Sequence, residues 1–553
     1  MMHPFRYNLS TILIVCLILT SFSTLAQEKE YWFYLKAKDS IFNPHFEPTK
    51  DILQYNGMDV KLKAVLANYR LKVFKKTYRN ATPKEYGRLF FVIADKKEFL
   101  EDILENASHI FISGERVAEE DQKIFEPNDY GLTSTVGRNE SDDVLMDYYD
   151  FLGLPKAWYY TTGSRATILG IADAEIDTSS IEFRDKVRII APTIPSGSHG
   201  SGTAGIAAAQ GNNGYRTAGV CYDCSIYSTS YGRFKDFEQL LELSELGVPV
   251  INCSWVGSTY YESGQKAIDS MYRGGTLIIA ASGNRDWNKT KGEKLYYPAS
   301  YENVISVASV SYKFPEVTDN IKYEESGNPY GENIRGFIGR TVGFKNKSTF
   351  SEPYSYGASL TTLNEAVDLL APVPGQLAMG KYITSGEIEY VMESTSPAAP
   401  LVTGTVGLML SLYPCLPINE IESILKLTSM NIDAIGDNSK YKGNYGAGIL
   451  QTGDAVEMVF QMVQEGETVT ISDQDFSRWD FKLTTYSEEV RIENQKFTGS
   501  STLNLTTKER IVLGPNTVLK PGKAGNISLK IDPSLAPECE LQLRDASILV
   551  DGR

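Results

Sequence analysis

One stretch of the chain runs from small polar residues directly into a long apolar segment: Glu393-Ser394-Thr395-Ser396-Pro397-Ala398-Ala399-Pro400-Leu401-Val402-Thr403-Gly404. A helix is expected over 398–412, so Ser396 lies just before its start. A serine hydroxyl is a weak nucleophile by itself. It needs a neighbouring base, a group that orients this base, and hydrogen-bond donors for the oxyanion that forms. The rest of the sequence therefore decides whether Ser396 is chemically active.

Three further motifs supply such partners. Asp173 ends the apolar run 166–172, His199 opens the segment His199-Gly200-Ser201-Gly202-Thr203-Ala204-Gly205, and Asn284 follows the apolar run 277–283. The four motifs together resemble the subtilisin-like serine proteases, in which Asp, His and Ser follow one another in that order along the chain. The resemblance covers about residues 127–465.

The resemblance implies a role for each of these residues. Asp173 would orient the imidazole of His199, and His199 would take the proton of Ser396. Asn284 would donate a hydrogen bond to the oxyanion. The substrate backbone would lie as a strand between residues 254–257 and residues 231–234. The expected substrate-binding residues are Ser254, Trp255, Val256, Gly257, Ala281, Ser282 and Gly283. The implied activity is that of a serine endopeptidase that forms an acyl-enzyme intermediate on peptide or protein substrates.

Two readings remain open at individual positions. Asp177 is a second carboxylate close to Asp173, although it lies beyond the end of the apolar run. Trp255 either faces the substrate or covers the core.

For the whole chain, the alternative to an enzyme is a catalytically silent subtilisin-like protein that binds or adheres. The intact set of four chemical residues favours the enzyme.

The sequence departs from the family pattern at a few positions close to these residues. Ala174-Glu175 follows Asp173 where Ser-Gly is usual, and Ser394 stands where glycine is usual. Pro397 and Leu401 replace a usual methionine and a common histidine.

The histidines give an internal argument for His199. The chain contains four, namely His3, His45, His109 and His199, and only the last lies in the catalytic region implied by the resemblance. A neutral imidazole is the side chain best suited to accept a proton near pH 7. His199 is therefore the expected general base.

The N-terminus has the pattern of a signal peptide over residues 1–26. His3 and Arg6 precede the apolar run 12–19, and the small-residue sequence Thr24-Leu25-Ala26 provides a cleavage site. This run is too short to span a bilayer, so no membrane span is expected. The chain is acidic, with a formal net charge of −15, and nothing in it suggests a nucleic-acid groove. These features predict a secreted or cell-surface protein.

The pattern of elements predicts three further regions after the signal peptide. Residues 27–126 read as a small α+β unit, in the place where the resembling family carries an inhibitory propeptide. Residues 127–465 alternate apolar strands with helices, which predicts an α/β fold with a parallel sheet covered on both faces. Residues 312–347 interrupt this pattern as a surface insertion. Residues 466–553 contain short alternating runs and predict a small all-β domain.

Five cysteines remain after the signal peptide. They are Cys221, Cys224, Cys253, Cys415 and Cys539. An odd number cannot all pair within one chain. Cys221 and Cys224 are close enough to form a tight disulfide loop, and Cys253 is expected to contribute to packing.

No metal ligands are assigned. The resemblance allows calcium, but the loops do not match well enough to name the residues that would hold it.

Overall fold

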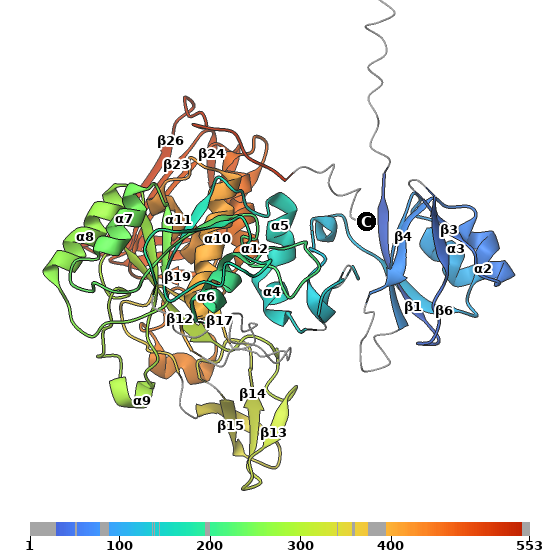
Figure 1. Ribbon diagram of the computed structural model, residues 1–553, viewed down its shortest axis with the longest axis horizontal. Helices are drawn as coiled ribbons and strands as arrows, with labels where there is room; N and C mark the ends of the chain where they lie inside the picture. The colour runs from blue at the N-terminus through green and yellow to red at the C-terminus, as the bar shows by residue number, and fades with distance from the viewer. Residues whose placement is uncertain are drawn as a thin grey trace, which may run out of the picture. The chain divides into compact units, whose positions relative to one another are not determined.

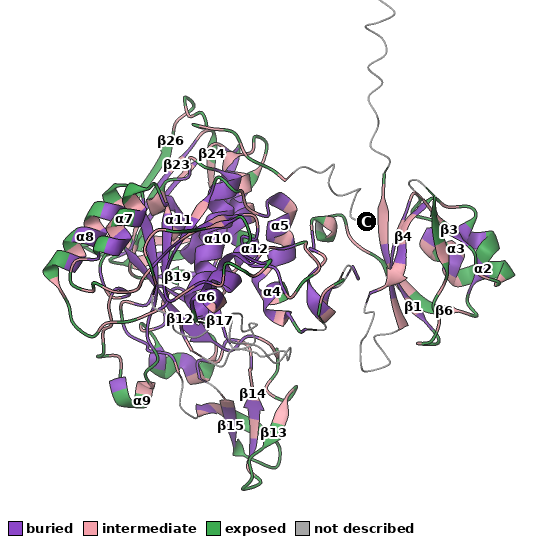
Figure 2. Ribbon diagram, in the orientation of Figure 1, coloured by how far each residue is buried: buried purple, intermediate pink, exposed green. Residues whose placement is uncertain are grey.

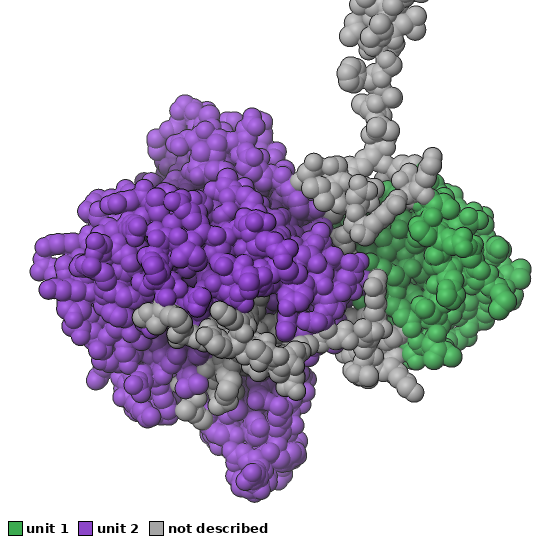
Figure 3. Space-filling model, viewed as in Figure 1, with its two compact units in different colours: residues 1–122 green, residues 123–553 purple. Residues whose placement is uncertain are grey.

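The computed structural model describes residues 29–49, 52–77, 88–134, 136–137, 139–142, 144–193, 199–339, 341–356, 360–373 and 394–544. The chain divides into two compact units, residues 1–122 and 123–553 (Figure 3). The predicted signal peptide, residues 1–26, lies outside the described residues.

The first unit contains an antiparallel sheet in the order β2-β3-β4-β5-β1-β6. Its elements are β1 (Tyr31–Ala37), β2 (Phe46–Thr49), β3 (Ile52–Tyr55), α2 (Val60–Leu66), β4 (Leu71–Lys76), β5 (Leu89–Ala94), α3 (Phe99–Asn106) and β6 (Phe111–Arg116). The two helices and the inward side chains of the sheet form a separate apolar core. Asp95 precedes α3 but does not cap it. The N-cap is Glu98, and the Asp95 carboxylate instead accepts the backbone N–H of Arg70 at 2.9 Å.

The second unit is built on a parallel sheet in the order β17-β12-β11-β10-β7-β9-β8. The strands are β7 (Ile168–Ala172), β8 (Val187–Ile189), β9 (Ser225–Thr229), β10 (Val250–Cys253), β11 (Leu277–Ala281), β12 (Val304–Val310) and β17 (Leu369–Pro372). The central strands β10, β11 and β12 are buried along their whole length, as a sheet covered on both faces requires. The predicted parallel sheet is therefore confirmed.

Helices cover both faces of this sheet (Figure 1). On one face, α7 and α8 form an apolar cluster with the sheet, and on the other α6, α10 and α12 belong to the main core. The helices of the unit are α4 (Asp147–Leu152), α5 (Leu154–Tyr160), α6 (His199–Ala208), α7 (Glu238–Glu245), α8 (Glu262–Arg273), α9 (Trp287–Thr290), α10 (Ala398–Leu412), α11 (Ile418–Leu427) and α12 (Thr452–Val463). All 15 residues of α10 are buried, which Figure 2 shows as a purple helix at the centre.

The predicted surface insertion contains regular structure. Residues 321–356 form an antiparallel sheet in the order β13-β14-β15-β16. The strands are β13 (Ile321–Tyr323), β14 (Pro329–Glu332), β15 (Thr341–Asn346) and β16 (Ser351–Tyr356).

The C-terminal strands form a three-sided parallel solenoid, in which each side is a sheet of three strands. Its first rung is β18 (Thr468–Ser472), β19 (Asp475–Phe476) and β20 (Asp480–Thr485). The second is β21 (Glu489–Glu493), β22 (Lys496–Gly499) and β23 (Thr502–Thr507), and the third is β24 (Arg510–Leu513), β25 (Val518–Pro521) and β26 (Asn526–Ile531). The all-β prediction is confirmed, but the sequence reasoning did not recognise the repeat.

The solenoid shares its core with the helices of the α/β region. Apolar residues of its first two rungs and of α10, α11 and α12 belong to one continuous buried cluster. The backbone N–H of Lys482 donates to Ser423 on α11 at 2.9 Å, and the Tyr486 N–H donates to the Met462 carbonyl on α12 at 2.6 Å. The expected boundary between residues 465 and 466 therefore falls inside one compact unit.

Two disulfides, Cys221–Cys224 and Cys415–Cys539, occur among the described residues, and Cys253 is a buried free thiol. The first is the tight loop expected from the sequence. The second joins the end of α10 to the segment that follows the solenoid, across 124 residues. Within the described ranges, no helix combines the length and the apolar character needed to cross a membrane.

A buried lysine connects α11 to the sheet and to the solenoid. Lys426 is 2% exposed, and its ammonium lies 3.0 Å from Asp368 Oδ1 and is also paired with Glu422. It lies 5.2 Å from the centre of the Trp479 ring in the solenoid. The second oxygen of Asp368 accepts the Ser306 N–H of β12. Both charges are thus taken out of water and depend on each other.

Lys426→Ala is expected to lower the free energy of unfolding by about 3–5 kcal/mol, because it leaves Asp368 buried without its cation. Urea unfolding at constant pH measures the change. The control is Lys440→Ala, which removes an exposed pair with Asp437 and should cost about 1 kcal/mol or less. Equal effects of the two substitutions would contradict the role assigned to Lys426.

Candidate active site

Three neighbouring strands of the parallel sheet end next to polar residues predicted to carry chemistry. Asp173 follows β7 directly, Ser254 follows β10, and Asn284 comes three residues after β11. These strands are adjacent in the order β11-β10-β7. Carboxyl ends of parallel strands lie at one edge of a sheet, so the fold gathers these residues there.

The Asp173 carboxylate is buried and fully hydrogen-bonded. Its Oδ1 atom accepts the Ala174 N–H at 2.6 Å and lies 2.7 Å from His199 Nδ1, while its Oδ2 atom accepts the Thr203 hydroxyl at 3.3 Å. Its side chain is 3% exposed. Asp177, the rival carboxylate, instead accepts hydrogen bonds from the backbone N–H and hydroxyl of Ser179. Of these two carboxylates, Asp173 is the one bonded to His199.

His199 is the first residue of α6, and the adjacent glycine allows the helix to approach the end of β7. A Cβ atom at Gly200 would lie 2.1 Å from the carbonyl oxygen of Ala174, so no side chain fits there. The His199 side chain is 46% exposed and keeps one face toward solvent.

The hydrogen bond that His199 donates to Asp173 raises the pKa of His199 above its ordinary value, and this effect outweighs the opposing effect of desolvation. The pairing therefore favours the folded state most strongly below the unfolded pKa of about 6.5. That contribution is lost as the pH rises through the higher folded pKa.

Ser396 lies immediately before α10 and is held through Ser254. Its Oγ atom donates to the Ser254 carbonyl at 3.3 Å, and its own carbonyl accepts the Ser254 hydroxyl at 2.9 Å. Asn252 at the end of β10 donates to the same Ser254 hydroxyl at 2.9 Å. Within the described residues, no hydrogen bond joins Ser396 Oγ to the His199 ring.

The orientation of Asn284 is fixed by the residue before Ser396. Its amide oxygen accepts both the backbone N–H and the hydroxyl of Thr395, each at 2.8 Å. The Thr395 hydroxyl also accepts the Gly283 N–H at 3.2 Å. With its oxygen engaged, Asn284 presents its NH₂ group as the free end of the amide.

Trp255 packs inward and connects the two sides of the site. Its indole N–H donates to the Ala172 carbonyl at 2.7 Å, directly before Asp173. Its ring lies 5.0 Å from that of Phe234 in an edge-to-face arrangement. The Trp255 ring thus covers the core, while the next side chain, Val256, is 36% exposed.

The other expected substrate residues differ in accessibility. Ala281 and Ser282 are buried, and the Ser282 hydroxyl donates to the Thr362 carbonyl. Gly257 pairs with Tyr297 through two backbone hydrogen bonds. Gly283 has a φ of +107°, which favours glycine, and a Cβ atom there would lie 2.9 Å from the Tyr296 ring. The Tyr296 ring therefore lies against the backbone next to Asn284.

Sequence reasoning missed the residues that position the expected ones. Thr395 and Thr203 hold Asn284 and Asp173 by side-chain hydrogen bonds. Ser254, expected to contact the substrate, also holds Ser396. Thr203 and Thr395 lie inside the motifs that were recognised, but their partners are distant in sequence.

Two other buried carboxylates lie close together elsewhere in the unit. Asp129 and Glu182 are both 0% exposed, and each has one oxygen, Oδ1 and Oε1 respectively, without a hydrogen-bond partner among the described residues. Asn213 donates to both, through its backbone N–H and its side-chain amide. Burial raises the pKa of Asp129 to about 6 and that of Glu182 to about 9. No cluster of three or more His, Cys, Asp or Glu side chains suited to a metal occurs in the described ranges.

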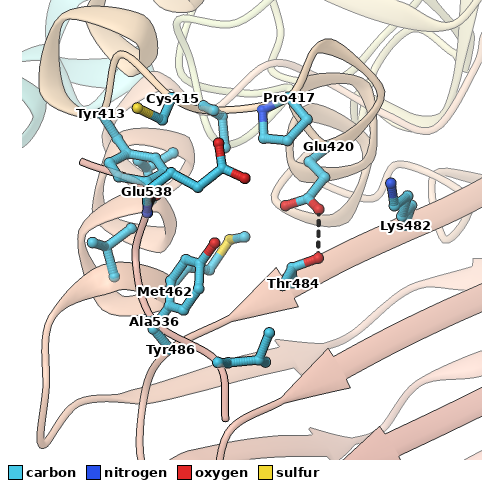
Figure 4. A pocket seen from close by; sticks show the side chains of 14 residues that line it. Tyr413, Cys415, Pro417, Glu420, Met462, Lys482, Thr484, Tyr486, Ala536 and Glu538 are labelled. Atoms are coloured by element: carbon cyan, nitrogen blue, oxygen red, sulfur yellow. Dashed lines mark hydrogen bonds between the residues drawn. The ribbon is translucent and has the colours of Figure 1, made fainter. Parts of the chain in front are cut away.

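A separate cavity lies between the loop after α10, the helices α11 and α12, the first rung of the solenoid and residues 535–538. It has a volume of about 270 Å³ and contains the side chains drawn in Figure 4, among them Tyr413, Glu420 and Tyr486. Glu420 accepts the Thr484 hydroxyl at 2.8 Å across it. None of the expected catalytic or substrate-binding residues lines this cavity.

The titration of His199 tests the Asp173 contact directly. The His199 ring signals in NMR spectra should titrate with a midpoint above about 6.5, and the midpoint should fall in Asp173→Asn, which removes the charged acceptor. His199→Gln identifies the signals, and Asp177→Asn serves as the matched control. A midpoint that moves in Asp177→Asn but not in Asp173→Asn would contradict the assignment.

Comparisons with known proteins agree with this arrangement. The family model described as the subtilase family matches residues 164–448. Subtilisin DY of Bacillus licheniformis is 26% identical over 250 residues, which cover 44% of this chain and 73% of that protein. A calcium-dependent protease of a Nostoc species is 25% identical over 361 residues, covering 58% of this chain and 50% of that protein.

Two further comparisons extend this picture. The halolysin-like extracellular serine protease Nep of Natrialba magadii is 25% identical over 276 residues, covering 49% of this chain and 42% of that protein. The match thus spans half or less of the Nostoc and Natrialba relatives. A solved protease structure from Pseudoalteromonas arctica, 21% identical, covers 57% of this chain and 97% of its own, with a TM-score of 0.42. Since the family model spans more than half of the chain, this protein belongs to the subtilase family of subtilisin-like serine proteases.

Proposed function

We propose that the chain is an exported endopeptidase in which Asp173, His199 and Ser396 act together on peptide bonds. The observation that carries this proposal is the 2.7 Å contact between His199 Nδ1 and the buried Asp173 carboxylate. It holds the proton on Nδ1 and leaves Nε2 as the basic nitrogen. Ser396 supplies the nucleophile from the start of a fully buried helix.

In the proposed mechanism, Nε2 of His199 takes the proton of Ser396 as Oγ attacks the substrate carbonyl. His199 then donates this proton to the leaving amine, and the acyl group remains on Ser396 until water releases it. In the structure the Ser396 hydroxyl donates to Ser254, so the mechanism requires it to turn toward His199 when substrate binds. Such catalytic hydrogen bonds commonly tighten only in the substrate complex.

The oxyanion would be stabilised by the Asn284 NH₂ group and the Ser396 backbone N–H. The two hydrogen bonds from Thr395 support this role, because they leave Asn284 no freedom to present its oxygen instead. Loss of one such donor typically lowers kcat by about 10²–10³.

The substrate would bind as an extended strand along residues 254–257 and 281–283. The Tyr296 ring lies against Gly283 and restricts the space on that side. We therefore expect small side chains immediately before the cleaved bond.

Export and maturation complete the proposal. The signal-peptide pattern of residues 1–26 supports export, and the extracellular relative is consistent with it. The compact α+β unit that precedes the catalytic region supports a role as a propeptide that assists folding and inhibits the enzyme.

The calcium-dependent relatives make calcium the expected ion, and Asp129 and Glu182 are the carboxylates that would hold it. Their unpartnered oxygens and mutual repulsion fit a divalent cation, which takes oxygen ligands.

Ser396→Ala should abolish peptide hydrolysis and fluorophosphonate labelling and leave the precursor at full length. The expected loss in kcat is about 10⁶, the size known for subtilisin. Casein cleavage, labelling and N-terminal sequencing of the exported product measure these effects. The matched control is Ser394→Ala, a neighbouring serine outside the proposed machinery, which should retain activity. If wild-type protein exports and folds but is never labelled, it is a silent binding protein instead.

Calcium is expected to raise the melting temperature, measured in the Ser396→Ala protein so that digestion does not interfere. At a hundredfold excess over Kd the stabilisation should be about 2.7 kcal/mol. Glu182→Gln should abolish the shift, whereas Glu245→Gln, an exposed site on α7, should keep it. A shift that persists in Glu182→Gln would place calcium elsewhere.

A further inference from the structure

The solenoid has a regular interior whose positions stack in columns. Strand pairing aligns Val469 with Val490 and Ile511, and Phe476 with Phe497 and Leu519. The remaining columns are Ile471–Ile492–Leu513, Phe481–Leu503–Ile527, Leu483–Leu505–Leu529 and Thr485–Thr507–Ile531. Each rung thus contributes six inward residues, and in the third rung all six are apolar.

Three of the six inward residues of the third rung are exposed, and the other three, Ile511, Leu519 and Ile527, are only partly buried. Those of the first two rungs are 0–2% exposed, whereas Leu513 is 54% exposed, Ile531 52% and Leu529 36%. Figure 2 shows exposed residues along β26 at the edge of the unit. A solenoid normally needs a polar or covered terminal repeat, because a bare apolar layer is costly in water.

The opposite end of the solenoid is covered. The first rung packs on α11 and α12, where the Thr484 hydroxyl donates to Glu420 and the Lys482 N–H donates to Ser423. At the third rung, β24, β25 and β26 are the last strands of their sheets, so each has one open backbone edge among the described residues. An open edge is a template for pairing with a further strand.

The third rung is also basic in an acidic protein. Residues 510–531 contain Arg510, Lys520, Lys523 and Lys530 and no Asp or Glu, while the whole chain has a net charge of −15. Arg510, Lys520 and Lys530 occupy outward positions on β24, β25 and β26, one on each side of the solenoid. Lys530 is paired with Asp532 at 2.8 Å, and Arg510 with Glu489 at 2.7 Å. Lys520 and Lys523 form no ion pair with any described residue.

The second rung shows how an acidic residue on a neighbouring strand can pair with one of these outward cations. Glu489 lies directly opposite Arg510 in the β21–β24 register, and its Oε2 atom lies 2.7 Å from the guanidinium. Opposite charges facing each other across neighbouring strands stabilise the pairing. A strand added beyond the third rung would need acidic residues at the outward positions and apolar residues at the inward ones.

We infer that the third rung is a docking surface for an extended polypeptide segment in which apolar and acidic residues alternate. Such a segment would pair with the open edges, cover Leu513, Leu529 and Ile531, and place carboxylates beside Lys520 and Lys523. A second copy of the chain fits less well, because an end-to-end dimer would bring two identical basic rungs together.

The test uses the full Ser396→Ala chain, which cannot digest a peptide by the proposed mechanism. The probe is a fluorescent ten-residue peptide of alternating valine and glutamate, and its binding is followed by anisotropy. Leu513→Glu should weaken binding by about tenfold or more, because it places a charge in the apolar layer. The control Leu246→Glu, at another exposed apolar residue, at the end of α7, should leave binding unchanged.

A charge exchange tests the acidic component separately. The combined Lys520→Glu and Lys523→Glu variant should lose affinity for the valine–glutamate peptide and gain affinity for a valine–lysine peptide. Equal binding of both peptides to the unmodified rung, or no saturable binding, would overturn the inference. So would a dimer in sedimentation analysis that Leu513→Glu converts to monomer, because the occupant would then be a second copy. Unchanged melting curves establish that the variants are folded.

Discussion

Helix α10 is enclosed by other elements on every side, because all 15 of its residues are buried. The sheet, α6 and α12 all pack against it, and its own side chains are therefore small or apolar. Ser396 stands at the entrance to this helix and His199 at the start of α6. The position of the expected nucleophile and base is thus set by the packing of the core, and a loop movement alone cannot separate them.

Hydrogen bonds also connect the residues that follow the strands of the parallel sheet. Ser254 and Trp255, which follow β10, bind on one side to Ser396 and on the other to the carbonyl before Asp173. Thr395 ties Asn284 to the residue before Ser396. Each expected chemical group is therefore held by a neighbour from another segment of the chain, which is how a site reaches the accuracy that proton transfer requires.

The sequence predicted the parallel sheet from its apolar runs, and the resemblance of four short motifs to a known family implied the pairing of Asp173 with His199. It could not predict that the Trp255 ring turns inward, since this depends on the Ala172 carbonyl and on Phe234. It also could not predict that Asp129 and Glu182 lie close together, because they are 53 residues apart in the sequence and neither lies in a recognised motif. The solenoid was overlooked because its alternation resembles any exposed strand; the 21-residue spacing of Val469, Val490 and Ile511 was the available signal.

The shared core of α11, α12 and the first rung has a consequence for how this protein could be shortened or evolve. A cut near residue 465 would not release an independent module, since it would strip cover from Ile421, Ile424 and Val459, which belong to the same buried cluster as Val469 and Phe481. The first rung therefore covers apolar side chains of α11 and α12 and forms part of the core of the protease region. The segment after the third rung returns to the end of α10, where Cys539 is bonded to Cys415 and the Gln542 N–H donates to the Leu412 carbonyl. The solenoid is thus fixed to the protease region at both ends of its sequence, and a shortened chain that keeps this fold has to keep the first rung and the returning segment.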